Sequence, residues 1–221
     1  MKIKKLANIA LNFGINRFLE IFGMCIVIMG VLLLISLISF SPDDPNFIFP
    51  EGTKIKNLLG YRGSFSSDLF FQSFGLISLL IPISLIFTGF HITLNKKIFI
   101  IFASIFFIIL YTLFGSLFFS FFYPNAFELY INGNGGFVGN YLQTIFVNFL
   151  IGFNSLVFYY LLILTILILF LISVQFNIIT FYKLIKKTFK FLFSERQKNY
   201  TNENEIINEF IPQEDIKSLI Q

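Results

Sequence analysis

The sequence predicts an all-α fold: an integral membrane protein with four transmembrane helices and an amphipathic helix before the last of them. Only 13% of the 221 residues are charged and 56% are hydrophobic, and the mean hydropathy is +0.81. Because a soluble domain carries about a quarter charged residues, lipid must be the solvent for most of this chain. Four apolar stretches are long enough to cross a bilayer, at about residues 21–40, 69–92, 98–122 and 155–176.

The first span follows a basic N-terminal arm, residues 1–17, and begins the membrane domain, residues 18–192. A secretory signal peptide also starts with basic residues, but the apolar run 21–40 is too long for one and lacks a small-x-small cleavage site. Twenty helical residues reach about 30 Å, the thickness of the hydrocarbon core. We therefore expect this run to remain in the protein as a transmembrane helix.

The second span contains Pro82, which predicts a kink, because proline cannot donate a backbone hydrogen bond. Hydroxyl groups nearby can satisfy the backbone that such a kink exposes; they belong to Ser78, Ser84 and Thr88. Asp68 directly precedes this span and is predicted to cap its helix. A tight turn at 95–97 leads into the third span.

An amphipathic helix is predicted at 138–150, before the fourth span. Its apolar residues recur at three- and four-residue spacing and are Val138, Tyr141, Leu142, Ile145, Phe146, Phe149 and Leu150. Asn140, Gln143, Thr144 and Asn148 fall between them. With no basic residue on its polar face, this helix either lies in the membrane interface or packs against another subunit, and the sequence leaves both open.

After the fourth span, four lysines repeat on one helical face: Lys183, Lys186, Lys187 and Lys190. We expect this segment to lie along the inner leaflet, since each basic residue near anionic lipid contributes about 1 kcal/mol. A nucleic-acid-binding helix is the alternative. Residues 193–221 are rich in Asn, Glu, Gln and Lys and are expected to begin a disordered cytoplasmic linker.

The distribution of positive charge predicts the topology. Thirteen of the 16 Lys and Arg residues lie before the first span, between the second and third, or after the fourth. By the positive-inside rule both termini are cytoplasmic, and the loops at 41–68 and 123–154 face outward.

The sequence argues against catalysis, metal binding and charged-substrate transport. The predicted spans contain no Asp, Glu, Lys or Arg, and the chain has one histidine, His91, and one cysteine, Cys25. The glycine-rich stretch 132–136 lacks the strand and the Gly-Lys-Ser/Thr ending of a phosphate-binding loop, and no Walker motif occurs. We expect no cofactor, no metal and no enzymatic activity in this segment.

Two loops carry a recurring set of turn-forming residues. The first contains Ser41-Pro42-Asp43-Asp44-Pro45, then Asn57-Leu-Leu-Gly60-Tyr-Arg-Gly63, then Asp68 and Phe74-Gly75; the second contains Gly135-Gly136-Phe-Val-Gly139. Together, from about residue 17 to 190, these motifs resemble the N-terminal membrane domain of the FtsK/SpoIIIE family of bacterial DNA translocases. Ser64 and Ser67 stand where the family favours Ala. From the residues themselves we expect Asp44 to hold a local turn, and Gly60 and Gly63 to allow positive φ or close backbone approach.

The resemblance implies a domain that anchors a translocase at the division septum in the inner membrane, contacts division proteins and assembles with copies of itself. Direct contact of this segment with nucleic acid is not expected. The uncharged amphipathic helix and the small residues Gly23 and Gly30 on the first span lead us to expect contacts between copies there. The rival interpretation is an unrelated channel or transporter subunit, but the polar residues that would line its path are too scattered to form a stripe: Ser36, Ser39, Ser104, Thr112 and Ser116.

Overall fold

The computed structural model describes residues 2–45, 54–124, 132–150, 154–177 and 186. Within these ranges every regular element is a helix, and four helical stretches are long and apolar enough to cross a membrane: Ile9–Ile38, Gly60–Asn95, Phe99–Phe122 and Ser155–Ser173. The predicted all-α, four-span fold is therefore confirmed. Lys186 is exposed, whereas Lys183, Lys187, Lys190 and the predicted linker 193–221 lie outside the described residues.

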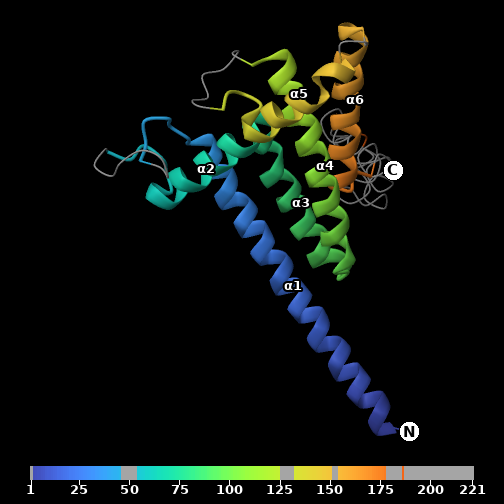
Figure 1. Cartoon of the computed structure of the whole chain (residues 1–221). Coiled ribbons are helices and arrows are strands. Elements are labelled where there is room, and N and C mark those ends of the chain that lie inside the picture. The colour runs from blue at the N-terminus through green and yellow to red at the C-terminus, as the bar shows by residue number, and fades with distance from the viewer. Residues whose placement is uncertain (1, 46–53, 125–131, 151–153, 178–185, 187–221) are drawn as a thin grey trace, which may run out of the picture. The chain divides into compact units, whose positions relative to one another are not determined.

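Helix α1 (Lys2–Ile38) is continuous from the basic N-terminus to the end of the first span. The predicted arm 1–17 is thus the start of the same helix, drawn in dark blue in Figure 1. Along its second half α1 packs most extensively against α3 (Leu80–Asn95). The side chains of Leu19, Ile26 and Ile92 form a small core between them, although Ile92 lies more than 60 residues after the other two.

Glycines let α1 and α3 approach closely. A Cβ atom on Gly23 would lie 2.7 Å from the carbonyl oxygen of Gly89, and one on Gly30 would lie 2.8 Å from Cγ1 of Ile86. Both distances are shorter than a Cβ atom normally allows, so these glycines are used inside the chain. The hypothesis that Gly23 and Gly30 form a contact between copies is therefore wrong.

The second span consists of three pieces: α2 (Gly60–Phe74), a 3₁₀ turn, η1 (Gly75–Leu79), and α3. The interruption lies at Gly75, with φ of +74°, and not at Pro82 as predicted. Pro82 occupies the first turn of α3, where a missing backbone N–H costs least. Asp68 lies inside α2, so the prediction that it caps this span is also wrong.

Helix α4 (Phe99–Phe122) lies between α3 and α6 (Ser155–Ser173). The main core is formed by Ile77, Ile81, Ile108 and Tyr111. Two hydroxyl contacts join the helices inside this apolar region: Ser84 Oγ lies 3.1 Å from Tyr111 Oη, and Ser104 Oγ donates to the carbonyl of Ser173 at 3.1 Å. The outer surfaces of α1 and α6 carry exposed large apolar side chains, as lipid-facing helices do.

An ion-pair cluster lies at the end of the unit where α3 turns into α4. Glu20 of α1 accepts from Arg17 at 2.5 Å and from Lys96 Nζ at 2.9 Å. Lys96 ends α3 in the left-handed conformation, with φ of +54°. The pair Glu20–Lys96 therefore ties α1 to the α3–α4 turn.

Candidate functional site

The predicted motif residues gather at the opposite end of the unit, where α2 and α5 (Gly136–Leu150) lie across the ends of the longer helices (Figure 1). We call this region the α2–α5 end. It contains two networks of buried polar contacts. The first joins α1, the 41–45 segment and α2, and the second joins α2, α4 and α5.

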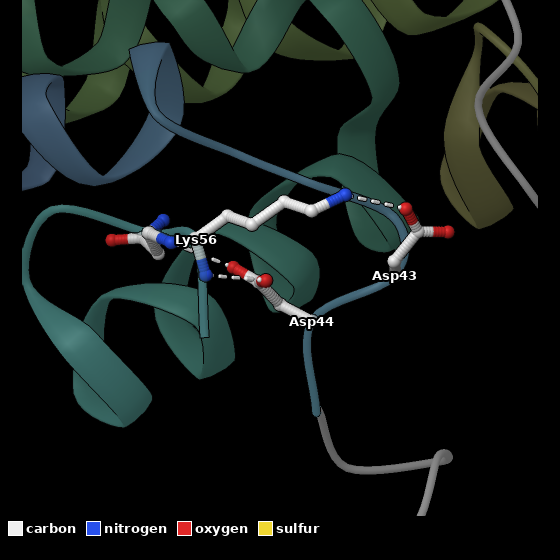
Figure 2. A network of polar contacts seen from close by, with 4 residues as sticks. Asp43, Asp44 and Lys56 are labelled. Atoms are coloured by element: carbon white, nitrogen blue, oxygen red, sulfur yellow. Dashed lines mark hydrogen bonds and ion pairs between the residues drawn. The ribbon is translucent and has the colours of Figure 1, made fainter. Parts of the chain in front are cut away.

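Asp44 organises the first network. Its Oδ1 accepts the backbone N–H of Lys56 at 2.7 Å and its Oδ2 accepts that of Asn57 at 2.8 Å, while the residue is 1% exposed. Figure 2 shows this carboxylate directed at the backbone of the segment before α2. The backbone N–H of Asp44 itself donates to Ser41. The side chain thus binds backbone 12 and 13 residues away and not the local backbone as predicted, whereas a turn is present at this position and is closed by the backbone N–H of Asp44.

Asp43 plays a different part from its neighbour. Its carboxylate pairs with Lys56 Nζ at 2.8 Å, and both side chains are more than half exposed (Figure 2). The hydrogen bond and charge of Asp43 raise the pKa of Lys56 above its usual range. An exposed pair of this kind contributes little to stability, so the buried Asp44 carries most of the connection.

Asn57 links this segment to α1 by hydrogen bonds. Its Nδ2 donates to the carbonyls of Ser36 at 2.9 Å and Ser39 at 3.2 Å, near the end of α1. Ser36 Oγ in turn donates to the carbonyl of Gly63 at 2.6 Å. A Cβ atom on Gly63 would collide with the Asn57 side chain, so this glycine allows the close approach that was predicted. Gly60 has a positive φ of +64°, the other predicted reason for a glycine.

Two serines of α2, Ser64 and Ser67, take part in this network. Ser64 Oγ donates to the carbonyl of Pro45 at 2.7 Å and is 2% exposed. Ser67 Oγ donates to Gly63 within α2 at 2.9 Å. Ser64 therefore adds a contact across 19 residues that alanine could not make, which sequence reasoning missed.

The second network begins where the two predicted motif loops meet. The carbonyl of Asn134 accepts the backbone N–H of Leu76 at 2.9 Å, and Asn134 Nδ2 donates to Tyr123 at 2.6 Å. Gly75 and Gly136 both have positive φ, +74° and +66°. A Cβ atom on Gly75 would collide with Asn134, and one on Gly136 with Phe74 and Gly75. Only glycine fits both positions.

Gly135 and Gly139 bring α5 onto α4. A Cβ atom on either would press against Ser116 and Ser120 of α4. Ser116 Oγ donates to the carbonyl of Phe74 at 2.8 Å, which also ties the end of α2 to α4. All three glycines of the second motif therefore act as contact points between backbones.

The orientation of α5 differs from that of a helix with its apolar side packed on the protein. Ser120 Oγ lies 2.8 Å from Asn140 Oδ1 and 2.6 Å from Gln143 Oε1, so the amide side chains face α4. Phe137, Tyr141 and Ile145 are exposed on the other side. The rings of Phe137 and Tyr141 stack, with centroids 6.3 Å apart. We call these three residues the α5 apolar edge.

The arrangement at the α2–α5 end can hold loops in place but has no chemistry of its own in the described ranges. No group of three His, Cys, Asp or Glu side chains that could bind a metal occurs there. His91 lies at the far end of α3, beside Asn95.

A comparison with protein-family models matches residues 16–186 to the 4TM region of DNA translocase FtsK/SpoIIIE. The chain belongs to this family. Segments of the chain are also similar to proteins named DNA translocase FtsK: 36% identity over 75 residues in Rickettsia bellii, and 39% over 57 residues in Rickettsia typhi. These matches cover 33% and 26% of this chain, but only 10% and 8% of the relatives. No solved structure matches.

In this FtsK/SpoIIIE membrane region, the motif residues from both loops are packing and hydrogen-bonding positions. Sequence reasoning missed their partners, which are Ser36, Ser116 and Ser120 on the spans and Asn134 in the second loop. The available signal was the presence of serines in apolar helices, since a buried hydroxyl needs a partner. Nothing in the sequence said which backbone each would reach.

Proposed function

We propose that this chain anchors and assembles a DNA translocase at the division septum, and that this segment carries no motor activity. The observation that supports the proposal is the meeting of Gly75 with Gly136: it joins the two motif loops into one surface at one end of the membrane unit. That surface is held by buried hydrogen bonds and presents the α5 apolar edge. A rigid surface on a membrane anchor suits the docking of other proteins.

The proposed topology places the α2–α5 end outside the inner membrane and both termini in the cytoplasm. The charge distribution supports this orientation, because 13 of the 16 basic residues belong to the other side. Single cysteines in place of Lys54 and Lys97, in a Cys25→Ser background, provide the test. An impermeant maleimide added to intact cells should label the first and spare the second; the reverse pattern overturns the orientation.

Septal function is tested with a fluorescent fusion in dividing bacteria. We expect a midcell band for the wild-type chain and for Gly14→Ala, whose new Cβ would meet nothing within 4 Å. Gly136→Ala should lose the band because it separates the two loops. Uniform membrane fluorescence for the wild-type chain would exclude septal recruitment by this region.

The channel alternative finds no support in the hydroxyl groups that would have to line a path. Ser36, Ser104 and Ser116 each donate to a backbone carbonyl of another segment. Ser39 and Thr112 donate to carbonyls of their own helices. Ion flux through proteoliposomes at the leakage level of empty vesicles is the expected result.

A further inference from the structure

A pocket of about 400 Å³ opens between α1, α2 and α3, close to the first polar network. It is lined by Met29, Leu32, Leu33, Ser36, Leu59, Arg62, Gly63, Ser66, Phe70 and Leu85. Most of this lining is hydrocarbon. Its one ionised side chain is Arg62, which α2 contributes at its first turn.

The apolar wall of the pocket is continuous with the lipid-facing surface of α1. Met29 is 65% exposed and Leu32 is 46% exposed, and both also line the pocket. In a bilayer these side chains face acyl chains, so the pocket opens sideways into lipid. An acyl chain can therefore enter it without crossing water.

Arg62 lies beside the end of the first span, where we expect the membrane boundary. The carbonyl of its neighbour Gly63 is bound to Ser36, two residues before the end of α1, which is about 3 Å along the helix axis. No carboxylate in the described ranges forms an ion pair with Arg62. A guanidinium group can bind the two oxygens of a phosphate with parallel hydrogen bonds, and at this depth the available phosphates are those of lipid headgroups.

We propose that this pocket binds one phospholipid, with an acyl chain between α1, α2 and α3 and the headgroup phosphate on Arg62. The acyl chain exchanges one hydrocarbon environment for another, so it must fit the shape of the pocket but gives little preference for one lipid over another. Selectivity then comes from the charge of the headgroup. Binding should weaken with salt and should be lost for a lipid of the same chains without phosphate.

The test measures lipid binding to the full chain in detergent by native mass spectrometry, using dioleoyl phosphatidylglycerol and the uncharged dioleoylglycerol. We expect one tightly held phosphatidylglycerol per chain and no retained dioleoylglycerol. Arg62→Gln should weaken binding about fivefold, the effect of about 1 kcal/mol for one basic residue near anionic lipid. Lys54→Gln, which removes an exposed cation before α2, is the matched control and should change nothing.

A second variant tests the shape of the pocket. Ser66→Leu fills the pocket and removes only a hydrogen bond within α2, from Ser66 Oγ to the backbone carbonyl of Arg62. It should abolish the tightly held lipid while the unfolding temperature without lipid stays unchanged. Equal losses for Arg62→Gln and Lys54→Gln would indicate diffuse attraction and overturn the proposal. So would equal binding of both lipids, or retention of lipid by a folded Ser66→Leu variant.

Discussion

Gly75 and Gly136, 61 residues apart, face each other so closely that a Cβ atom on Gly136 would contact the amide nitrogen of Gly75. Both have positive φ, so each turns its segment sharply at the contact. Gly75 ends α2 and Gly136 begins α5. The contact therefore fixes the directions of both short helices at the α2–α5 end.

Substituting these glycines should separate conformational strain from collision. Gly60→Ala introduces only strain, because its φ is +64° and a Cβ would meet nothing within 4 Å; it should cost roughly 1–2 kcal/mol. Gly136→Ala adds a collision with Phe74 and Gly75 and should cost clearly more. Unfolding in a graded series of denaturing detergent measures both free energies.

Gly14→Ala completes that series, because Gly14 lies in α1 with open space around it. Alanine is the better helix former by about 0.5–1 kcal/mol, so this variant should be neutral or slightly stabilised. Equal costs at Gly60 and Gly136 would contradict the described contact between the two loops.

Asp44→Asn should destabilise the first network. The carboxylate uses one oxygen for each of two backbone N–H groups, whereas an amide offers one acceptor and turns an N–H₂ group toward the other donor. A buried donor without a partner costs about 1–3 kcal/mol. The same detergent titration applied to Asp43→Asn is the control: its exposed pair with Lys56 should be worth about 0–1 kcal/mol. A cost at Asp43 matching that at Asp44 would refute this division of roles.

The number of spans could be predicted because a long apolar run is a local property of the chain. The start of the second span could not be predicted, because α2 carries Arg62, Asp68 and four serines, a composition typical of a loop. Several of these polar groups are tolerated through partners far away in sequence, as with Ser64 and Pro45. Periodicity in a single segment contains no information about such contacts.

The motif glycines were recognisable as special positions, but their contacts were not. The sequence marks Gly75 and Gly136 as turn residues, yet the collision that requires glycine at each of them involves the other loop. The orientation of α5 was also beyond prediction. Its amphipathic pattern shows two faces, and only Ser120 on another helix shows that the amide face is the inner one.

Ser64→Ala should show whether the contact from α2 to Pro45 stabilises this chain. The change leaves the carbonyl of Pro45 without its donor at 2.7 Å. We expect a loss of about 1 kcal/mol in the free energy of unfolding. Ser66→Ala removes a bond within α2 on its more exposed side and should be nearly neutral. Equal effects of the two variants would mean that the contact with Pro45 contributes nothing.

The close crossing of α1 and α3 predicts a stability effect without an assembly effect. A Cβ atom on Gly89 would lie 2.8 Å from the backbone nitrogen of Val27, so Gly89→Ala must push the helices apart and should cost about 1–3 kcal/mol, as overpacking does. The mass of the detergent-solubilised protein by light scattering should stay the same. A change in that mass without a loss of stability would support the earlier hypothesis that the glycines of this crossing, Gly23 and Gly30 among them, form contacts between copies.

The α5 apolar edge is the surface on which we expect copies of the chain to meet. Tyr141 is 59% exposed and stacked on Phe137, and large aromatic side chains dominate binding at protein interfaces. Tyr141→Ala should weaken self-association about tenfold, the effect of about 1.4 kcal/mol. Thr144→Ala, on the same exposed helix, is the matched control and should leave it unchanged. Sedimentation equilibrium in detergent measures self-association of both variants.

The amphipathic pattern also allows α5 to lie in the membrane interface. If neither variant alters self-association but Tyr141→Ala reduces the binding of α5 to lipid vesicles, the α5 apolar edge lies in the membrane interface.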